Sequence, residues 1–353
     1  MTFYIVSKNY PNYSICSENK IDNIFLEEYS IIKYNNSNIL YNENKKKYIS
    51  YNNNNIIHTS LIEQAFPITL EKTDIKTNYK IKINDGYIRH KYYNLYLEKT
   101  NIINNDFIWI LIDKKNNNNH DFIIARYNEN INWTRFLQGN VFIYNKNNLN
   151  LEINFQTNNN IKIINLQNIG REGHTYLYHI INNYHQINEI NIFLQGDPFV
   201  HSPDLFELLC MSDEYTDIQS LSLRHLPGSP SYNIVEKYKK NLNGASFSVF
   251  KFKHDIQIVG DRYNGYLFGS EPFLAKYKHN DKIISMFLKK CNIDIDKETY
   301  EGNLCGLFSI KKKCILSKSI ETYKKILDEL LSTRQDGYVL EKVWFTIFEY
   351  NEY

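Results

Sequence analysis

The chain has 353 residues, enough to bury a sizeable core and to form two domains more readily than one. Its 41 Lys and Arg residues against 39 Asp and Glu residues leave a net charge of +2, so no global field points to nucleic acid or to an acidic membrane. The five cysteines form no CxxC pair, which argues against a disulfide framework and a zinc site and favours a reducing compartment.

Residues 1–115 consist of short apolar or alternating runs separated by Asn-rich turns, without a helical period. Such runs predict an all-β domain with strands at 3–6, 30–33, 47–51, 68–71, 79–83, 95–98 and 107–112. Two stretches about 40 residues apart look alike: Tyr48-Ile49 followed by Phe66, and Tyr87-Ile88 followed by Phe107. Three β-rich units of this length would close into a compact barrel, and such a domain resembles a β-trefoil of the fascin or lectin kind. An all-β domain of unspecified topology is the alternative. We expect this accessory domain to have a structural or targeting role.

A polar run at 114–120, KKNNNNH, is the predicted linker. After it, the pattern of strand, polar loop, helix and strand predicts βαβ units and a mostly parallel sheet in an α/β domain spanning 120–353. The predicted strands are 122–125, 141–144, 161–166, 190–194 and 302–310. Irregular loops are expected over 201–280, and helices are predicted at 281–289, 320–330 and 340–347.

The stretch 168–201 carries most of the candidate chemistry. A helix opens at Gly170 and Gly173, and its apolar stripe is predicted to be core, with Glu172, Thr175 and His179 on the other side. The free N–H groups and positive dipole of its first turn favour a phosphate, and Arg171 adds a fork of donors. The alternative is that Glu172 only complements the dipole, while His174 and His179 are packing groups.

The run Gln195-Gly196-Asp197-Pro198 directly follows an apolar strand. A carboxylate held there is suited to a hard cation that bridges phosphates, and His201 lies just beyond it as a metal ligand or substrate contact. The alternative makes Asp197 a turn former. Neither GxSxG, HExxH, a Walker loop nor GxGxxG occurs, so acyl transfer, zinc hydrolysis and P-loop chemistry have no motif support.

Residues 121–353 resemble an uncharacterised domain family found in fungi, bacteria and large DNA viruses. The likeness rests on ARYNE with a following Trp133, on FIYNK, on the stretch 168–201, and on a CGLF strand with a late EKVWFTIF helix. The first 115 residues lie outside it.

The order of these motifs is also similar to that of a GT-A glycosyltransferase. This resemblance implies that Asp197 stands where the metal carboxylate of the DxD motif stands, and that Glu341 or His201 is the base for the acceptor. QGD in place of DxD leaves the metal dependence open, and Lys342 replaces an Arg suited to clamping a phosphate. The predicted substrate- and nucleotide-binding residues are Arg126, Asn128, Glu129, Asn145, Lys146, Asn168, Arg171, Glu172, His174 and Gln195.

The resulting hypothesis is a glycosyltransferase that moves a sugar from a nucleotide-sugar donor to a hydroxyl of a glycan or protein acceptor, with a divalent cation (Mn²⁺ or Mg²⁺) as cofactor. The alternative is a non-catalytic carbohydrate- or protein-binding module, including a structural protein of a virus particle. Without a signal peptide or a run of roughly 18 apolar residues, we expect a soluble protein without a membrane span. Its expected location is the cytoplasm, or the host cytoplasm or virion if it is viral.

Overall fold

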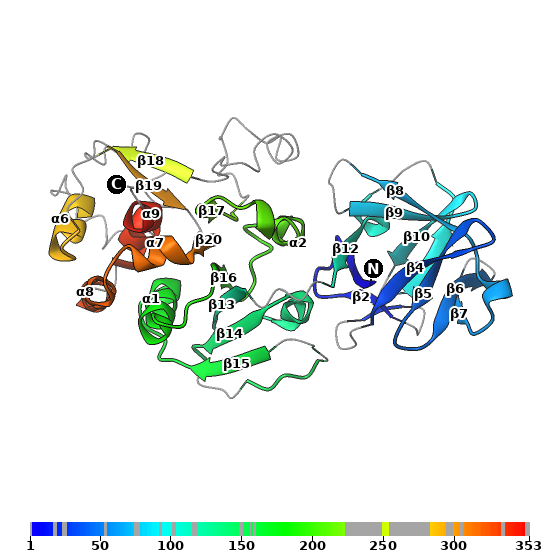
Figure 1. Ribbon diagram of the computed structural model, residues 1–353, viewed down its shortest axis with the longest axis horizontal. Helices are drawn as coiled ribbons and strands as arrows, with labels where there is room; N and C mark the ends of the chain where they lie inside the picture. Colours follow the sequence, from blue (N-terminus) through cyan, green and yellow to red (C-terminus); the bar gives the residue numbers. More distant parts are fainter. Residues whose placement is uncertain are drawn as a thin grey trace.

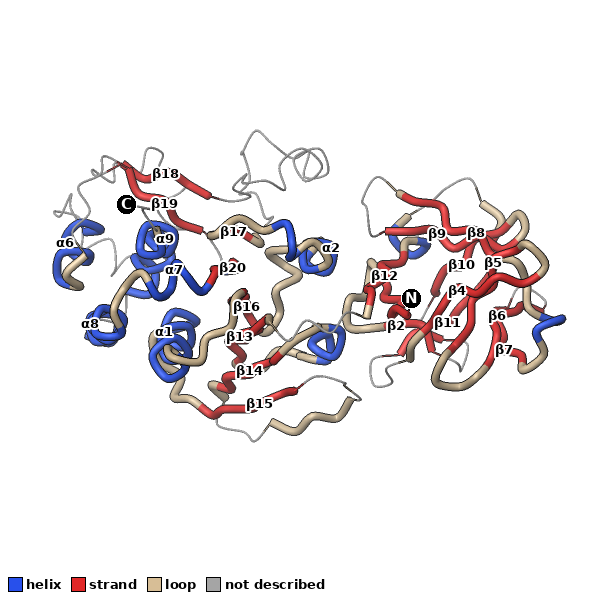
Figure 2. Tube along the Cα trace, in the orientation of Figure 1, coloured by secondary structure: helices blue, strands red, loops and turns tan. Residues whose placement is uncertain are grey.

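The protein is mostly β-structure, with a large antiparallel N-terminal sheet and a second, mixed sheet (Figures 1 and 2). The computed structural model describes residues 2–16, 20–22, 27–52, 55–73, 78–91, 94–100, 104–114, 119–147, 151–155, 157, 160–222, 249–253, 283–293, 299–303, 306–332 and 336–349. Most of the predicted linker and much of the predicted loop region 201–280 lie outside these residues. The domain limits at 115 and 120 stay predictions.

Twelve strands of the described residues form the N-terminal sheet. They are β1 Thr2–Ser7, β2 Ser14–Cys16, β3 Lys20–Asp22, β4 Tyr29–Tyr34, β5 Ser37–Asn42, β6 Lys47–Asn52, β7 Asn55–Thr59, β8 Ile68–Lys72, β9 Asn78–Ile83, β10 Gly86–Lys91, β11 Asn94–Glu98 and β12 Trp109–Asp113. The strand order is β10-β11-β3-β2-β1-β12-β9-β8-β5-β6-β7, and two further pairings, β10–β9 and β11–β7, join strands that lie apart in this order. Short 3-10 helices occur at η1 Ile62–Gln64 and η2 Asn105–Phe107. The all-β expectation is confirmed, and the trefoil stays a prediction.

The second sheet has the order β15-β14-β13-β16-β20-β17. Its strands are β13 His120–Arg126, β14 Asn140–Asn145, β15 Asn160–Asn165, β16 Ile190–Gln195, β17 Ile218–Ser220 and β20 Phe308–Lys311. The pairs β13–β14, β14–β15 and β13–β16 are parallel, whereas β20 is antiparallel to both neighbours, which makes the sheet mixed.

Helices and short turns cover both faces of the second sheet, which explains its continuous apolar runs. Ile123 and Phe193 face the core beneath the helices α1, α6, α7, α8 and α9, whereas Phe122 and Ile192 face the core beneath η3 and α2. The elements are α1 Arg171–Asn183, α2 Leu205–Leu209, α6 Ile283–Lys290, α7 Lys312–Leu316, α8 Ile320–Ser332, α9 Asp336–Phe348, η3 Asn132–Phe136 and η4 Ser212–Glu214. Among the described residues, no helix is both long enough and apolar enough to cross a membrane.

The two sheets share an apolar seam. Alternate residues of β1 point in opposite directions: Phe3 and Ile5 belong to the N-terminal core, while Tyr4 and Val6 pack with Phe136 and Phe206 from the second sheet's side. Strand β12 contributes Ile110 and Ile112 to the same seam. Every residue of β1 from Phe3 onward is buried because both of its faces are covered.

The single strand predicted over 302–310 is wrong. Strand β19, Thr299–Asn303, pairs with β18, Val249–Lys253, in a separate two-stranded sheet, whereas β20 belongs to the second sheet. Gly306 lies between β19 and β20 in the chain, and its φ of +61° is a left-handed conformation that interrupts an extended chain.

Candidate functional site

The order of the second sheet reverses at β13. Strands β13, β14 and β15 follow one another on one side, and the chain then passes through α1 to β16 on the other side of β13. In open α/β sheets, ligands bind outside the carboxyl ends of the strands where the order reverses. Arg126, Asn145 and Gln195 are the last residues of β13, β14 and β16, so the sheet brings these three predicted site residues to one edge. We call this edge, with the loops that follow these strands, the strand-end site.

A ladder of polar side chains crosses the strand-end site. Arg126 is in register with Asn145, and Asn145 with Asn165 at the end of β15. Arg126 Nη1 donates to Asn145 Oδ1 at 2.7 Å, and Asn145 Nδ2 donates to Asn165 Oδ1 at 3.0 Å. Asn145 is fully buried, so these bonds satisfy its amide. Sequence reasoning missed Asn165, although its place at the end of a predicted strand matches that of Asn145.

Glu129 packs directly on Gly196. Its carboxylate Oε2 accepts the backbone N–H groups of Tyr127 at 2.7 Å and Asn128 at 3.1 Å. A Cβ added at Gly196 would lie 2.6 Å from that same oxygen, so the close approach requires glycine. On its other side, Gly196 O accepts the indole N–H of Trp133 at 2.9 Å. Glu129 therefore shapes the loop after β13 and fixes it against the loop after β16.

Asp197 is exposed, and its Oδ1 accepts the backbone N–H of Phe199 at 3.3 Å. This is the turn-forming arrangement that the sequence left open as an alternative. His201 closes the same turn, because its backbone N–H donates to Pro198 O at 3.1 Å. Gln195 is half-buried, while Asn128 and Asn168 are exposed. Their ligand-binding roles stay predictions.

Lys146 holds the entry to α1. Its side chain is buried, and Nζ donates to Ile169 O at 2.6 Å and to Arg171 O. Gly170 and Arg171 between these carbonyls both have left-handed backbone conformations, with φ of 58° and 52°. Burial lowers the pKa of Lys146 to about 8, against the opposing effect of Glu172. The ammonium thus binds the strained turn. The Arg171 side chain is half-exposed, and its Nε lies 3.6 Å from Glu172 Oε2.

Two carboxylates converge on Tyr176. Burial, followed by the charges of Glu172 and Glu341, raises the pKa of Tyr176 well above its ordinary value. The Tyr176 hydroxyl donates to Gly306 O at 2.9 Å, and a Cβ at Gly306 would lie 3.3 Å from Glu172 Cγ. Glu172 therefore lies beside Gly306, just before β20, and the charges of Glu172 on α1 and Glu341 on α9 both act on Tyr176.

The histidines of α1 belong to the core. His179 is fully buried, its Nδ1 lies 2.8 Å from the hydroxyl of Tyr144, and burial lowers its pKa to about 3. Burial and the charge of Lys146 lower the pKa of His174 to about 4. The expectation that Thr175 and His179 lie away from the core is wrong, because both are fully buried on a helix that packs on more than one side.

These contacts form two connected groups. The first runs from Asn165 through Asn145, Arg126 and Glu129 to Gly196, next to Asp197. The second consists of Lys146, Arg171, Glu172, Tyr176 and Glu341 around the first turns of α1. They meet where Lys146 follows Asn145 in the chain.

The residues present do not assemble a cation site on their own. Within the described ranges, no three His, Cys, Asp or Glu side chains gather in a way that could hold a metal ion. The Glu129 carboxylate accepts two backbone N–H groups, and Asp197 stands alone at the surface. No step proposed below depends on a cation.

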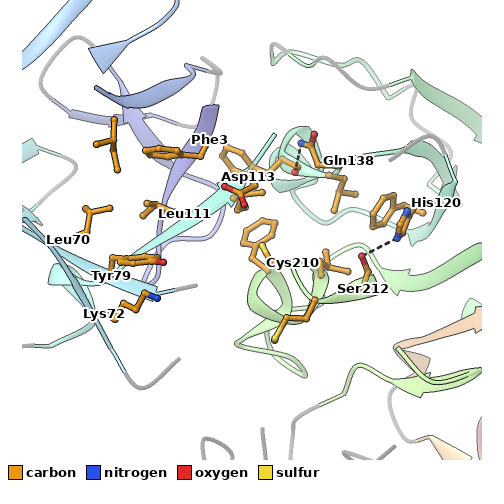
Figure 3. A pocket seen from close by; sticks show the side chains of 18 residues that line it. Phe3, Leu70, Lys72, Tyr79, Leu111, Asp113, His120, Gln138, Cys210 and Ser212 are labelled. Carbon is orange, nitrogen blue, oxygen red and sulfur yellow. Dashed lines mark hydrogen bonds between the residues drawn. The ribbon is translucent and has the colours of Figure 1, made fainter. Parts of the chain in front are cut away.

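A cavity of about 400 Å³ lies at the opposite end of β13 (Figure 3). It occupies the seam, with Phe3, Leu70 and Tyr79 on one wall and Cys210 and Ser212 on the other. His120, the first residue of β13, lines it and places Nε2 3.0 Å from Ser212 Oγ. The cavity is therefore separate from the strand-end site.

Comparisons with known proteins show similarity to one family and to solved structures, two of which are described below. No curated protein matches the chain. A GlcNAcα1-4Gal releasing endo-β-galactosidase from Clostridium perfringens is 12% identical, with a TM-score of 0.27, over 31% of this chain and 31% of that one. SeviL bound to asialo-GM1 saccharide is 15% identical, with a TM-score of 0.26, over 31% of this chain and 94% of that one. The chain thus spans about a third of the galactosidase. Residues 122–239, which contain most of the strand-end site, match the model of an uncharacterised family described as "Protein of unknown function (DUF3431)".

Proposed function

We propose that the strand-end site binds a nucleoside-diphosphate sugar and that the protein transfers the glycosyl group to a hydroxyl acceptor. The observation that carries the proposal is the gathering of Arg126, Asn145 and the first turn of α1 at the reversal of strand order. Backbone N–H groups of a helix N-terminus and nearby guanidinium groups suit the charge and geometry of a diphosphate. The GT-A resemblance of the motif order points to the same chemistry.

In this mechanism the protein acts by positioning and by charge. The bond between the anomeric carbon and the diphosphate oxygen breaks as the bond to the acceptor oxygen forms. Arg171, with a half-exposed side chain beside the first turn of α1, stabilises the negative charge that develops on the leaving diphosphate. Glu341 accepts the proton of the acceptor hydroxyl.

The test combines binding and turnover with a panel of nucleotide sugars, each with and without Mn²⁺ or Mg²⁺. We expect one donor to raise the melting temperature and to be hydrolysed or transferred. Donor binding should weaken in Arg171→Gln, and turnover should fall about 100-fold in Glu341→Gln. If no donor is bound or consumed under any condition, the transferase hypothesis is wrong.

Asp197→Asn tests whether the carboxylate that follows β16 takes part in turnover. Asp197→Asn keeps a side-chain oxygen for the Phe199 N–H group and removes only the charge, so the turn is expected to survive. An enzyme that uses this carboxylate should lose turnover at an unchanged melting temperature. Asp197→Ala, which also removes the acceptor of the turn, is the matched control for loop geometry.

The second candidate is a non-catalytic carbohydrate-binding module. It is favoured by the use of both nearby carboxylates in local structure: Glu129 accepts two backbone N–H groups and Asp197 closes a turn. In that case a glycan array would give a saccharide ligand, no donor would be consumed, and Asp197→Asn would bind the saccharide as tightly as the unaltered protein.

A further inference from the structure

The loop between β1 and β2, residues 8–13, contacts the second sheet beside the strand-end site. Lys8 Nζ donates to Pro203 O at 3.1 Å, to the Asp204 carboxylate, and to Glu207 Oε1 at 2.5 Å. The Lys8 side chain is 10% exposed and that of Glu207 is fully buried. An ion pair this deeply buried is seldom retained for stability alone, because desolvation offsets most of its attraction.

The same loop makes a second contact through Asn12. Asn12 Oδ1 accepts the backbone N–H of Trp133 at 2.9 Å. Trp133 is fully buried, and its indole N–H donates to Gly196 O at 2.9 Å. Its ring also packs edge-on against Phe199, with the centroids 5.6 Å apart. Asn12 is thus connected to Gly196, the residue before Asp197, through a single residue, Trp133.

The contacts of Lys8 and Asn12 lie at the two ends of one segment of the chain. We define the site loop as residues 196–203, which contains Asp197 and His201. Asn12 acts through Trp133 on its first residue, Gly196, whereas Lys8 binds its last residue, Pro203, and the Asp204 and Glu207 side chains that follow. Within the loop, Pro198 O accepts the backbone N–H groups of His201 and Ser202.

We propose that Lys8 and Asn12 are positioning residues that hold the site loop from the N-terminal sheet. The N-terminal sheet is then a structural part of the strand-end site and not an appended module. This inference rests on the proposed function only for the effect on turnover, since the geometry of the loop is measurable without any ligand.

Electrostatics supports the assignment of Lys8. Burial raises the pKa of Glu207 above its ordinary value, and the positive charge of Lys8 offsets only part of that rise. The second carboxylate oxygen, Glu207 Oε2, has no hydrogen-bond partner among the described residues. Lys8 therefore supplies the positive charge that pairs with Glu207 at the base of the site loop.

Hydrogen exchange of the full chain, read by mass spectrometry, tests the proposal. In Lys8→Met and in Asn12→Ala, we expect the amides of 196–203 to exchange about tenfold faster or more, while those of β13, β14 and β16 keep their protection. Lys8→Arg should restore slow exchange. Lys114→Met is the matched control, because Lys114 pairs with Glu28 at 2.6 Å inside the N-terminal part.

The outcomes separate this inference from the proposed function. Unchanged exchange of the site loop in both variants, or equal acceleration across the whole second sheet, would overturn the positioning role whatever the activity. If Lys8→Met does not fold, Asn12→Ala alone decides. With UDP-glucose as the probe in a turnover assay, faster exchange accompanied by a lower kcat at unchanged KM supports both proposals. Faster exchange in the variants, together with no turnover of any donor of the panel by the unaltered protein, supports positioning and removes the transferase.

Discussion

Replacement of Gly196 by alanine tests how the two loops of the strand-end site are fixed to each other. A Cβ at this position would lie 2.6 Å from Glu129 Oε2, 3.0 Å from Cδ and 3.1 Å from Cβ. These contacts are too short, and because the nearest atom ends a flexible side chain, Glu129 is expected to swing away. It then loses its bonds to the backbone N–H groups of Tyr127 and Asn128.

The magnitude follows from those two bonds. A hydrogen bond to a charged group contributes about 1.5–3 kcal/mol when its donor is shielded from water. Tyr127 and Asn128 are exposed, so water replaces part of each bond. We therefore expect Gly196→Ala to lower the free energy of unfolding by about 1–3 kcal/mol, with the larger value if Trp133 also loses its bond to Gly196 O.

A double-mutant cycle isolates the contact. In the Glu129→Ala background the two shortest contacts, with Oε2 and Cδ, are gone and only the Cβ contact at 3.1 Å remains, so adding Gly196→Ala should cost clearly less than it does beside Glu129. The assay is urea unfolding followed by tryptophan fluorescence for all four proteins. If the two changes prove additive within error, Glu129 does not press on Gly196 and the argument from close approach is wrong.

The remaining predictions concern α1. Because burial lowers the pKa of His179 to about 3, the unfolded chain takes up a proton below its ordinary pKa of 6.5 while the folded protein does not. The free energy of unfolding is therefore unaffected by this histidine above pH 6.5 and falls by at most about 1.4 kcal/mol per pH unit below it. In a pH series of urea unfolding, His179→Phe should flatten the decline on the acid side. An unaltered slope would contradict the assignment. Tyr176→Phe loses the bond to Gly306 O and should lower the free energy of unfolding by about 1 kcal/mol, whereas an unchanged midpoint in the same titration would show that the bond does not form.

Strand positions were predictable where the chain alternates or runs apolar. The runs at β1, β9, β13 and β14 are of this kind, and each is a strand in the structure. Of the missed strands, β2 and β3 have three residues each, β5 is rich in Asn and Ser, and β7 and β10 carry polar residues beside their apolar ones. Several are extended because distant partners pair with them. Strand β7, for example, pairs with β6 and with β11, nearly 40 residues further along the chain.

The candidate site divides in the same way. Arg126 and Asn145 end strands that the apolar runs predicted, and Asp197 follows a third, so their places in the sheet were predictable from the sequence. Their binding roles stay predictions. The burial of Thr175 and His179 was not predicted, because one apolar stripe does not reveal that a helix is covered on a second side.

By itself, then, the sequence determined an all-β first part, a later pattern of strands and helices, and a set of polar residues at strand ends. Only the tertiary structure decided that β20 runs antiparallel, that Glu129 closes on Gly196, and that Lys8 and Asn12 reach the site loop. The physical reason is range. Periodicity and turn chemistry report on the nearest few residues, whereas the Lys8–Pro203 contact joins positions 195 residues apart and exists only after both sheets have packed along the seam.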